Sequence, residues 1–232
     1  MTDPLHERLA EQVAYYRARA PEYDAWANRE GDFDRGLHND AWHTEKRRLA
    51  TALRDFRPSG CVLEIAGGTG QWTEQLLRYS PLLTVLDAAP EALEENRKRT
   101  ARRTAMIEYL QGDVFTWEPT ERYDVVFFSY WLSHVPPERF AQFWKQVDRF
   151  LKPDGRVFLI DNLPTEAAEE LDPEIPADDD AVLRSAPDGN LYRVWKVLWH
   201  PEDLRKVLSD LGWAFEASPT GHYFLWAQGS RR

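Results

Sequence analysis

Three glycines within four positions, Gly67, Gly68 and Gly70, follow an apolar run at 61–66, and an amphipathic segment begins directly after them. A strand that ends in small residues and leads into a helix brings backbone N–H groups close to a ligand. A dinucleotide fingerprint would need a third glycine where Thr73 stands, and a phosphate-binding P-loop would need a lysine that this stretch lacks. The glycines therefore predict a binding loop, and they disfavour a nucleoside triphosphate and weaken the case for NAD.

Carboxylates stand near this loop and near the ends of the next two apolar runs. Glu64 precedes the glycines, Asp87 lies near the end of the run at 82–88, and Asp113 ends the run at 106–113. A carboxylate accepts hydrogen bonds, so Asp87 can bind both hydroxyls of a ribose. We expect the three acids to lie beside the glycine loop.

The pattern of apolar residues predicts the elements that position these groups. Apolar runs predict strands at 61–66, 82–88, 106–113, 123–130, 153–162, 191–200 and 222–229. Helical periodicity predicts helices at 1–20, 41–56, 71–79, 90–103, 137–152 and 201–212. The alternation of strands and helices predicts an α/β fold, a three-layer doubly wound sheet.

Two segments lie outside this alternation. Residues 1–58 predict an N-terminal helical lid, or cap, over a core at 59–232. An acidic, proline-rich stretch at about 162–190 predicts a long surface insertion after the fifth strand.

The order Glu64-x-Ala66-x-Gly68-x-Gly70 resembles the first motif of class I S-adenosylmethionine-dependent methyltransferases of the small-molecule type, acid-x-Gly-x-Gly-x-Gly. Ala66 replaces the first glycine of that pattern with a residue that is still small. The segments after the next three strands follow in the family's order, so the resemblance covers 60–163 well and continues more loosely to the end. It implies a Rossmann-like core of seven strands, the last antiparallel, with S-adenosylmethionine as cofactor.

The resemblance also implies which residues bind this cofactor. Asp87 would bind the ribose hydroxyls, Asp113 would meet the adenine, and the glycines would let the backbone reach the methionine end. Tyr16 lies in a segment that resembles the family's cap helix and would close over the site. The expected cofactor-binding residues are Glu64, Ala66, Gly67, Gly68, Gly70, Trp72, Asp87, Ala88, Asp113, Val114, Ser129, Tyr130 and Tyr16.

Methyl transfer from a sulfonium requires the acceptor atom in line with the methyl carbon, and an alcohol acceptor also requires a base. His134, shortly after the fourth strand, is the leading candidate for this base because histidine titrates near neutral pH. Asp161, at the end of the fifth strand, could position a hydroxyl, and Tyr16 is a third catalytic candidate. A Mg²⁺ ion held by Asp161 and His134 is a further option.

Aromatic residues near this edge predict an aromatic-walled pocket for a small-molecule acceptor. Because aromatic faces stack on sugars and acids accept sugar hydroxyls, we expect O-methylation of a hydroxylated acceptor, such as a sugar or a glycosylated metabolite. An N-methyltransferase of a small amine and a non-catalytic cofactor-binding regulatory protein remain alternatives, and a nicotinamide oxidoreductase is a weaker one. The expected acceptor-binding residues are Trp131, His134, Tyr15, Tyr23, His38 and Trp42.

Composition and charge limit which classes of partner and which cellular location we expect. The formal net charge of −10 and the pI of about 5.1 disfavour binding to a nucleic acid. The sequence shows no membrane-length apolar run and no signal peptide at its charged start, and Cys61 is the single cysteine. We therefore expect a cytoplasmic enzyme without nucleic-acid or membrane partners, and a homodimer is an open option.

Overall fold

A computed structural model describes residues 4–103, 105–165, 175–178 and 181–232. Its main sheet has seven strands in the order β3-β2-β1-β4-β5-β10-β9, with parallel pairing from β3 to β5 and with β10 antiparallel to both of its neighbours. This confirms the predicted α/β sheet with an antiparallel strand at its far side. The strands are β1 Cys61–Ile65, β2 Leu82–Asp87, β3 Met106–Gln111, β4 Tyr123–Ser129, β5 Leu151–Asn162, β9 Trp213–Pro219 and β10 Phe224–Arg231.

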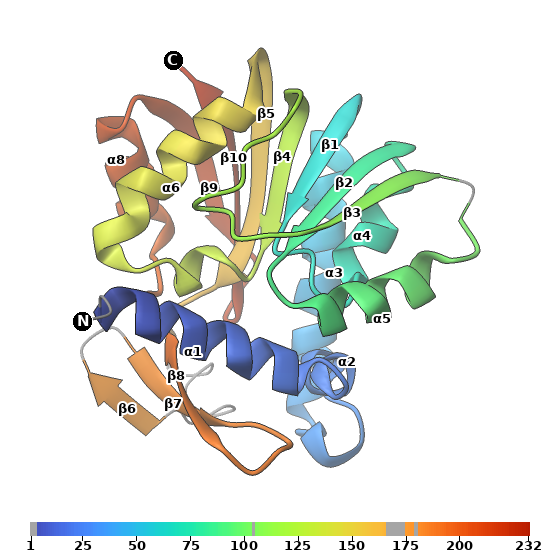
Figure 1. The fold of residues 1–232 in the computed structure, drawn as a ribbon, viewed down its shortest axis with the longest axis vertical. Helices are drawn as coiled ribbons and strands as arrows, with labels where there is room; N and C mark the ends of the chain where they lie inside the picture. Colours follow the sequence, from blue (N-terminus) through green and yellow to red (C-terminus); the bar gives the residue numbers. More distant parts are fainter. Residues whose placement is uncertain (1–3, 104, 166–174, 179–180) are drawn as a thin grey trace.

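Helices cover both faces of this sheet (Figure 1). Side chains alternate between the faces of a strand, so Val126 and Phe128 of β4 pack with α6 and α8, whereas Val125 and Phe127 pack with α3, α4 and α5. The result is the predicted three-layer arrangement. The helices of these layers are α3 His38–Phe56, α4 Gln71–Leu76, α5 Pro90–Thr100, α6 Pro137–Phe150 and α8 Pro201–Asp210.

A second, three-stranded antiparallel sheet is formed by β6 Ile175–Asp178, β7 Ala181–Ser185 and β8 Leu191–Trp195. Two sequence predictions are corrected here. The strand predicted at 191–200 ends at Trp195 and belongs to this small sheet, and the seventh strand of the main sheet is β9, which was not predicted. In β9, Trp213, Phe215 and Ala217 pack against the core while Ala214 and Glu216 are exposed, as in an edge strand with one buried face.

The described part of the predicted insertion also carries strands. β6 and β7 fall within 162–190, while residues 166–174 and 179–180 of that segment lie outside the described residues. Since β7 and β8 pair along their whole length, the insertion continues into β8.

The N-terminal 1–58 segment contains two kinds of helix. Leu49, Leu53 and Phe56 of α3 are buried against the main sheet, so α3 is part of a core layer. By contrast, α1 (Pro4–Arg19) lies across one end of the main sheet with β6–β8 on its far side (Figure 1), and Tyr15 packs against Val194 of the small sheet. The short α2 (Tyr23–Asn28) follows α1 directly.

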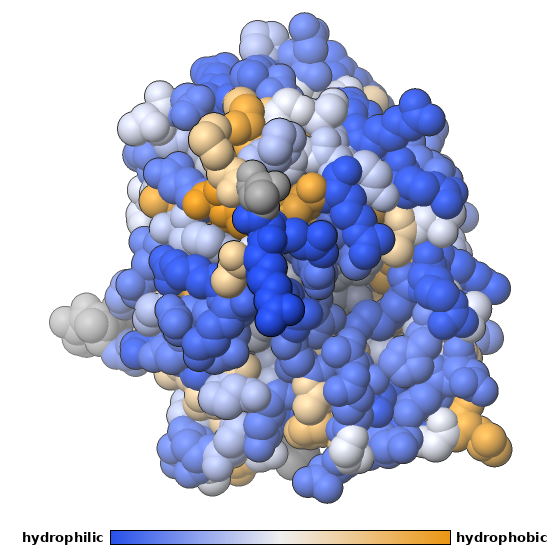
Figure 2. Space-filling model, turned by 90° about the vertical axis from the view of Figure 1, so that its right-hand side faces the viewer, coloured by the Kyte–Doolittle hydropathy of each residue, from blue (hydrophilic) through white to orange (hydrophobic). Residues whose placement is uncertain are grey.

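The molecular face on the side of α5 is mostly hydrophilic (Figure 2). None of the helices in the described ranges is both long enough and apolar enough to cross a membrane. The large apolar side chains with substantial exposure, among the residues described, are Leu37, Leu82, Met106 and Leu191.

Candidate active site

The glycine loop between β1 and α4 has a left-handed backbone at three positions. The φ angles are 52° at Ala66, 54° at Gly68 and 90° at Gly70. A Cβ atom on Gly70 would lie 2.6 Å from the Asn96 side chain, and one on Gly67 would lie 2.3 Å from Val85, so packing requires glycine at both. A Cβ atom on Gly68 would come no closer than 4.0 Å to any neighbour, so Gly68 marks the open side of the loop.

Ala66 keeps the conformation that the first glycine of such a loop would adopt. A left-handed backbone costs an L-residue other than glycine about 1–2 kcal/mol. The loop therefore stores strain at Ala66, as residues at binding sites often do.

Glu64 lies beneath the loop and is almost completely buried. Its Oε2 atom accepts a 2.6 Å hydrogen bond from the Thr73 hydroxyl, whereas Oε1 has no hydrogen-bond partner among the described residues. Burial raises the pKa of Glu64 to about 8. An ammonium or other donor that reached Oε1 would favour the ionised carboxylate.

Asp87 and Asp113 follow adjacent strands at the same edge of the sheet. Asp87 accepts hydrogen bonds from the backbone N–H groups of Gly68 and Ala89, each at 2.8 Å, which ties the end of β2 to the glycine loop. Burial raises the pKa of the Asp87 carboxyl, and these backbone hydrogen bonds oppose that rise. Asp113 is exposed and accepts a hydrogen bond from the Phe115 N–H at 2.9 Å through Oδ1.

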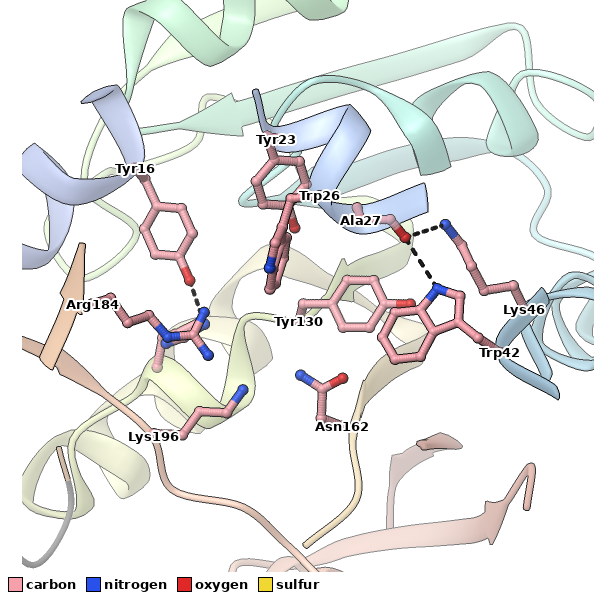
Figure 3. A pocket seen from close by; sticks show the side chains of 11 residues that line it. Tyr16, Tyr23, Trp26, Ala27, Trp42, Lys46, Tyr130, Asn162, Arg184 and Lys196 are labelled. Carbon is pink, nitrogen blue, oxygen red and sulfur yellow. Dashed lines mark hydrogen bonds between the residues drawn. The ribbon is translucent and has the colours of Figure 1, made fainter. Parts of the chain in front are cut away.

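Beyond the ends of β4 and β5, a pocket contains about 420 Å³ of space not filled by atoms, part of it open to solvent (Figure 3). Figure 3 shows Arg184 and Lys196 on one side of it, Lys46 and Trp42 on the other, and Tyr130 between them. Tyr130 directly follows β4 and has a left-handed φ of 53°, an unusual conformation for a bulky residue. The lining residues are Tyr16, Tyr23, Trp26, Ala27, Trp42, Lys46, Tyr130, His134, Asn162, Arg184 and Lys196.

Tyr16 and His134 form a hydrogen-bonded pair in the wall of this pocket. The Tyr16 hydroxyl lies 2.6 Å from Nε2 of His134, and Nδ1 lies 2.6 Å from the carbonyl oxygen of Trp195. A carbonyl oxygen only accepts hydrogen bonds, so Nδ1 carries the proton and Nε2 of the neutral ring accepts from Tyr16.

Burial lowers the pKa of His134 well below its usual range, and the nearby charges of Lys196 and Arg184 lower it further. His134 is therefore neutral near pH 7. Burial also raises the pKa of Tyr16, so this residue carries its proton. Gln12 of α1 links the pair to β8, because it donates to the His134 carbonyl oxygen and accepts from the Trp195 N–H.

The short helix α2 is hydrogen-bonded directly to the glycine loop and to the start of α4. Asp24 accepts hydrogen bonds from the Thr69 hydroxyl at 2.6 Å and from the Gln71 amide at 2.9 Å, and it forms an ion pair with Arg99 of α5. Lys46 of α3 donates to Gln71 from the pocket side. The loop and the pocket thus share one hydrogen-bonded wall.

Comparison with known proteins decides what this arrangement is. Residues 62–155 match the family described as "Methyltransferase domain". Structures of DhpI bound to SAH and of DhpI bound to SAM and HEP align with TM-scores of 0.77 and 0.78 at 32% and 33% identity. The alignments cover 97% and 99% of this chain, and 98% and 100% of the DhpI chains. The chain belongs to the class I S-adenosylmethionine-dependent methyltransferases.

Curated relatives of this methyltransferase match about half of the chain. The malonyl-[acyl-carrier protein] O-methyltransferase of Paenibacillus sp. (strain JDR-2) is 32% identical over 139 residues, 54% of this chain and 48% of the relative. The N-terminal Xaa-Pro-Lys N-methyltransferase 1 of Danio rerio is 27% identical over 113 residues, 47% of this chain and 50% of the relative. The chain thus spans about half the length of each, and the two names give different methylated atoms.

The loop of this methyltransferase fits S-adenosylmethionine, its methyl donor. Gly68 leaves open space at the loop, and Glu64 holds a buried oxygen without a hydrogen-bond partner among the described residues. The methionine end of the donor carries an ammonium group, which complements that oxygen. Asp87 ends β2 and Asp113 lies two residues after β3, where the ribose and adenine are expected.

The predicted site residues divide between the pocket and the core. Tyr16, Tyr23, Trp42 and His134, and also Tyr130, which was predicted to bind the cofactor, line the pocket. Trp72 and Val114 are buried in the two main core clusters beside the loop ends, and Ser129 and Ala88 are partly buried at the strand ends.

Three predicted acceptor-binding residues do not line the pocket. Tyr15 packs against Tyr192 and Val194 of the small sheet, and Trp131 packs against Phe115 and Phe143. His38 is exposed at the start of α3.

Asp161 lies behind the pocket wall. It is buried, and its oxygens accept hydrogen bonds from the N–H groups of Ser133 and Asn162 at 2.8 and 2.7 Å. Its neighbour Asn162 lines the pocket instead. Within the described residues no cluster of three or more His, Cys, Asp or Glu side chains could hold a metal, and we assign no metal role to Asp161 and His134.

Three cationic lining residues were not predicted: Lys46, Arg184 and Lys196. Lys46 belongs to α3, where a basic residue reads as part of an exposed face. Arg184 stands in the sequence "AVLRS" inside an acidic segment, and Lys196 follows the apolar run "LYRVW". The sequence signal for Arg184 was a basic residue within an acidic segment. That signal does not predict the pocket, because Arg184 reaches the pocket only when the small sheet packs on α1.

Proposed function

We propose that this enzyme transfers a methyl group from S-adenosylmethionine to an oxygen atom of a small molecule bound in the pocket. The observation that carries the proposal is the lining itself. It combines the aromatic faces of Trp26, Trp42 and Tyr130 with cationic and amide donors, and no carboxylate lines the pocket among the described residues. Such a pocket suits a compact acceptor with hydrogen-bond-accepting oxygens.

An amine acceptor fits this lining poorly. Most amines are ammonium ions near neutral pH, and they need a carboxylate to bind and a base to remove a proton before attack. Arg184 and Lys196 would repel such an ion, and His134 is disfavoured as a proton acceptor. These facts favour oxygen over nitrogen as the methylated atom.

The sugar acceptor expected from the sequence has partial support. Its aromatic faces are present, but the acids that would accept sugar hydroxyls are absent from the described lining. The structures of DhpI with SAM and HEP show that a similar chain holds the donor and a second molecule together. The pocket is the place for that second molecule in this chain.

Each half of the site has a distinct task in the proposal. When bound, S-adenosylmethionine supplies an electrophilic methyl group. Glu64, Gly68 and Asp87 hold and orient the donor, and the Tyr16 hydroxyl touches the acceptor. His134 is a positioning residue, because it keeps Tyr16 in place through Nε2 and does not itself need to accept a proton.

Radiolabelled methyl transfer tests this proposal. The protein is incubated with labelled S-adenosylmethionine and two pools of aromatic small molecules, one of alcohols, phenols, carboxylates and phosphates, the other of amines. We expect labelled product from the oxygen pool. Label in the amines alone, or no product from either pool although S-adenosylhomocysteine binds, would overturn the proposal.

A further inference from the structure

Positive charge is concentrated in the pocket of an otherwise acidic protein. The chain has a formal net charge of −10, yet three basic side chains line the pocket. Arg184 comes from β7 and Lys196 directly follows β8, so both reach the pocket from the small sheet (Figure 3). Lys46 lies on the opposite side and donates to Ala27, Asn28 and Gln71.

The positive charges of Arg184 and Lys196 lie at the same part of the pocket. The guanidinium of Arg184 lies 5.6 Å from the centre of the Trp26 ring. Arg184 and Lys196 both interact electrostatically with His134, and Lys196 also interacts with Asp161. In Figure 3 the amide of Asn162 points into the space between Lys196 and Tyr130.

Arg184, Lys196 and the amide of Asn162 line one cationic corner of the pocket. Asp161 is the acid behind it, and both of its oxygens accept backbone N–H groups. The other titratable lining groups on this side, Tyr16, Tyr23 and His134, are neutral near pH 7, because burial raises the pKa of both tyrosines and lowers that of His134.

When bound, the methyl donor adds a further positive charge to the site. An anion between the sulfonium and the corner formed by Arg184 and Lys196 would be attracted by both. An anion also removes the need for a base, since an ionised oxygen is already a nucleophile.

From this arrangement, and resting on the proposed function above, we propose that the acceptor is a small-molecule oxyanion, a carboxylate or a phosphoryl group. Its charged oxygens bind Arg184, Lys196 and Asn162, and one of them receives the methyl group. The planar guanidinium of Arg184 matches two oxygens of either group, and Lys196 acts as a point charge. Trp26 and Tyr130 cover the organic part of the acceptor.

The reaction balances without a proton acceptor. An electron pair of the acceptor oxygen forms the new O–CH₃ bond while the S–CH₃ bond breaks and leaves its pair on sulfur. The positive charge of the sulfonium and one negative charge of the oxyanion disappear together, and the products are a methyl ester and a neutral thioether.

Calorimetry with matched probes tests the inference. Benzoate, phenyl phosphate and benzyl alcohol share an aromatic ring and differ in charge. We titrate each into the protein saturated with S-adenosylhomocysteine, and we expect at least one of the two anions to bind at least tenfold more tightly than benzyl alcohol. The stronger anion identifies the carboxylate or the phosphoryl class.

Variants connect this preference to the two cations. Arg184→Gln and Lys196→Gln should each reduce the anion preference at least fivefold, while Arg184→Lys should keep part of it. Arg149→Gln removes an exposed cation on α6 far from the lining and is the matched control. Thermal melting and S-adenosylhomocysteine affinity, both unchanged, show that each variant is folded.

Three results would overturn the inference: equal binding of benzyl alcohol and the anions, an unchanged preference in both glutamine variants, or methyl transfer to neutral alcohols only. The last result would leave the proposed O-methyltransferase intact. Absence of transfer to any oxygen compound would instead contradict the proposed function.

Discussion

The proposed donor side, which is the glycine loop with Asp87 and Asp113, and the proposed acceptor side, which is the pocket, are built in different ways. The donor side consists of loops that follow β1, β2 and β3, three neighbouring strands of one sheet. The acceptor side takes its lining from α1, α2, α3, the ends of β4 and β5, and the small sheet. Chemical function on the donor side depends on backbone conformation, whereas on the acceptor side it depends on the charge and shape of side chains from distant segments.

This contrast explains where the acceptor specificity of the enzyme can change. The donor loops are fixed by contacts within the core, such as those of Asn96 with Gly67, Gly68 and Thr73. Two of the three lining cations, Arg184 in β7 and Lys196 directly after β8, belong to the separate small sheet, so they can be altered without disturbing the main core. The predictions below test each side against a matched position.

Gly68→Val should have the largest effect on the donor side. A β-branched residue at a φ of 54° is strained, and its side chain would fill the open side of the loop. We expect S-adenosylhomocysteine affinity to fall at least 100-fold by calorimetry. Gly189→Val is the control, because Gly189 also has a positive φ and empty surroundings but lies between β7 and β8. An equal loss in both variants would contradict a specific role for Gly68.

Tyr16→Phe should have the largest effect on the acceptor side. It removes the hydroxyl that lies 2.6 Å from Nε2 of His134 and hydrogen-bonds to it, while the ring and its packing remain. We expect the rate of methyl transfer to fall at least tenfold with unchanged affinity for S-adenosylhomocysteine. Tyr15→Phe, one residue away and outside the lining, should leave the rate within twofold. Similar rates for the two variants would remove Tyr16 from the reaction.

The pH dependence of donor binding should report on Glu64. Its pKa of about 8 means that the free protein holds the carboxyl mostly protonated at pH 7, and a bound ammonium group would favour the ionised form. Binding therefore releases a proton, and S-adenosylhomocysteine affinity should rise by up to about tenfold per pH unit as the pH increases toward 8. Calorimetry in buffers of different ionisation enthalpy measures the released proton. A profile as steep in Glu64→Gln would show that another group is responsible.

Asp24→Asn should have a smaller effect. It changes the contacts that connect α2, on the acceptor side, to the glycine loop on the donor side. It weakens the hydrogen bonds from Thr69 and Gln71 and the ion pair with Arg99. We expect S-adenosylhomocysteine affinity to fall about threefold to tenfold, on the order of 1 kcal/mol. Glu91→Gln breaks the exposed Arg17–Glu91 pair, which also joins the lid to α5, and exposed pairs contribute little. A larger loss for Glu91→Gln would contradict the role of Asp24.

Ala66→Gly should have the smallest effect, and it should be favourable. Glycine relieves the strain at a φ of 52°, and this gain is partly offset by the greater freedom of the unfolded chain. We expect the melting temperature to rise by about 2 °C. Ala88→Gly, where φ is not positive, should lower it. A lower melting temperature for Ala66→Gly would show that the strain estimate is wrong.

The sequence predicts the donor side from local signals. The order Glu64-x-Ala66-x-Gly68-x-Gly70 and the acids at two strand ends each lie within one turn and its flanking elements. The positive φ at Ala66 confirms that this position needs the conformation of the missing glycine. Periodicity likewise identified the five strands from β1 to β5 and the final strand β10.

The acceptor side was only partly predictable because it depends on tertiary contacts. Nothing near Arg184 or Lys196 in the sequence indicates a pocket, and the strand β8 was assigned to the wrong sheet because an apolar run does not identify its pairing partner. His134 lines the pocket. Its second contact, with Trp195, comes from 61 residues away and decides its tautomer.

The most direct test of the central claim is the coupling between the two sides. Sinefungin carries an ammonium where the donor carries its sulfonium, has no transferable methyl group, and can be compared with the uncharged thioether of S-adenosylhomocysteine. The account predicts that benzoate or phenyl phosphate at saturating concentration strengthens sinefungin binding clearly more than S-adenosylhomocysteine binding. An equal effect on both ligands, or a weakening of sinefungin binding alone, would contradict an oxyanion held between the donor charge and the Arg184–Lys196 corner.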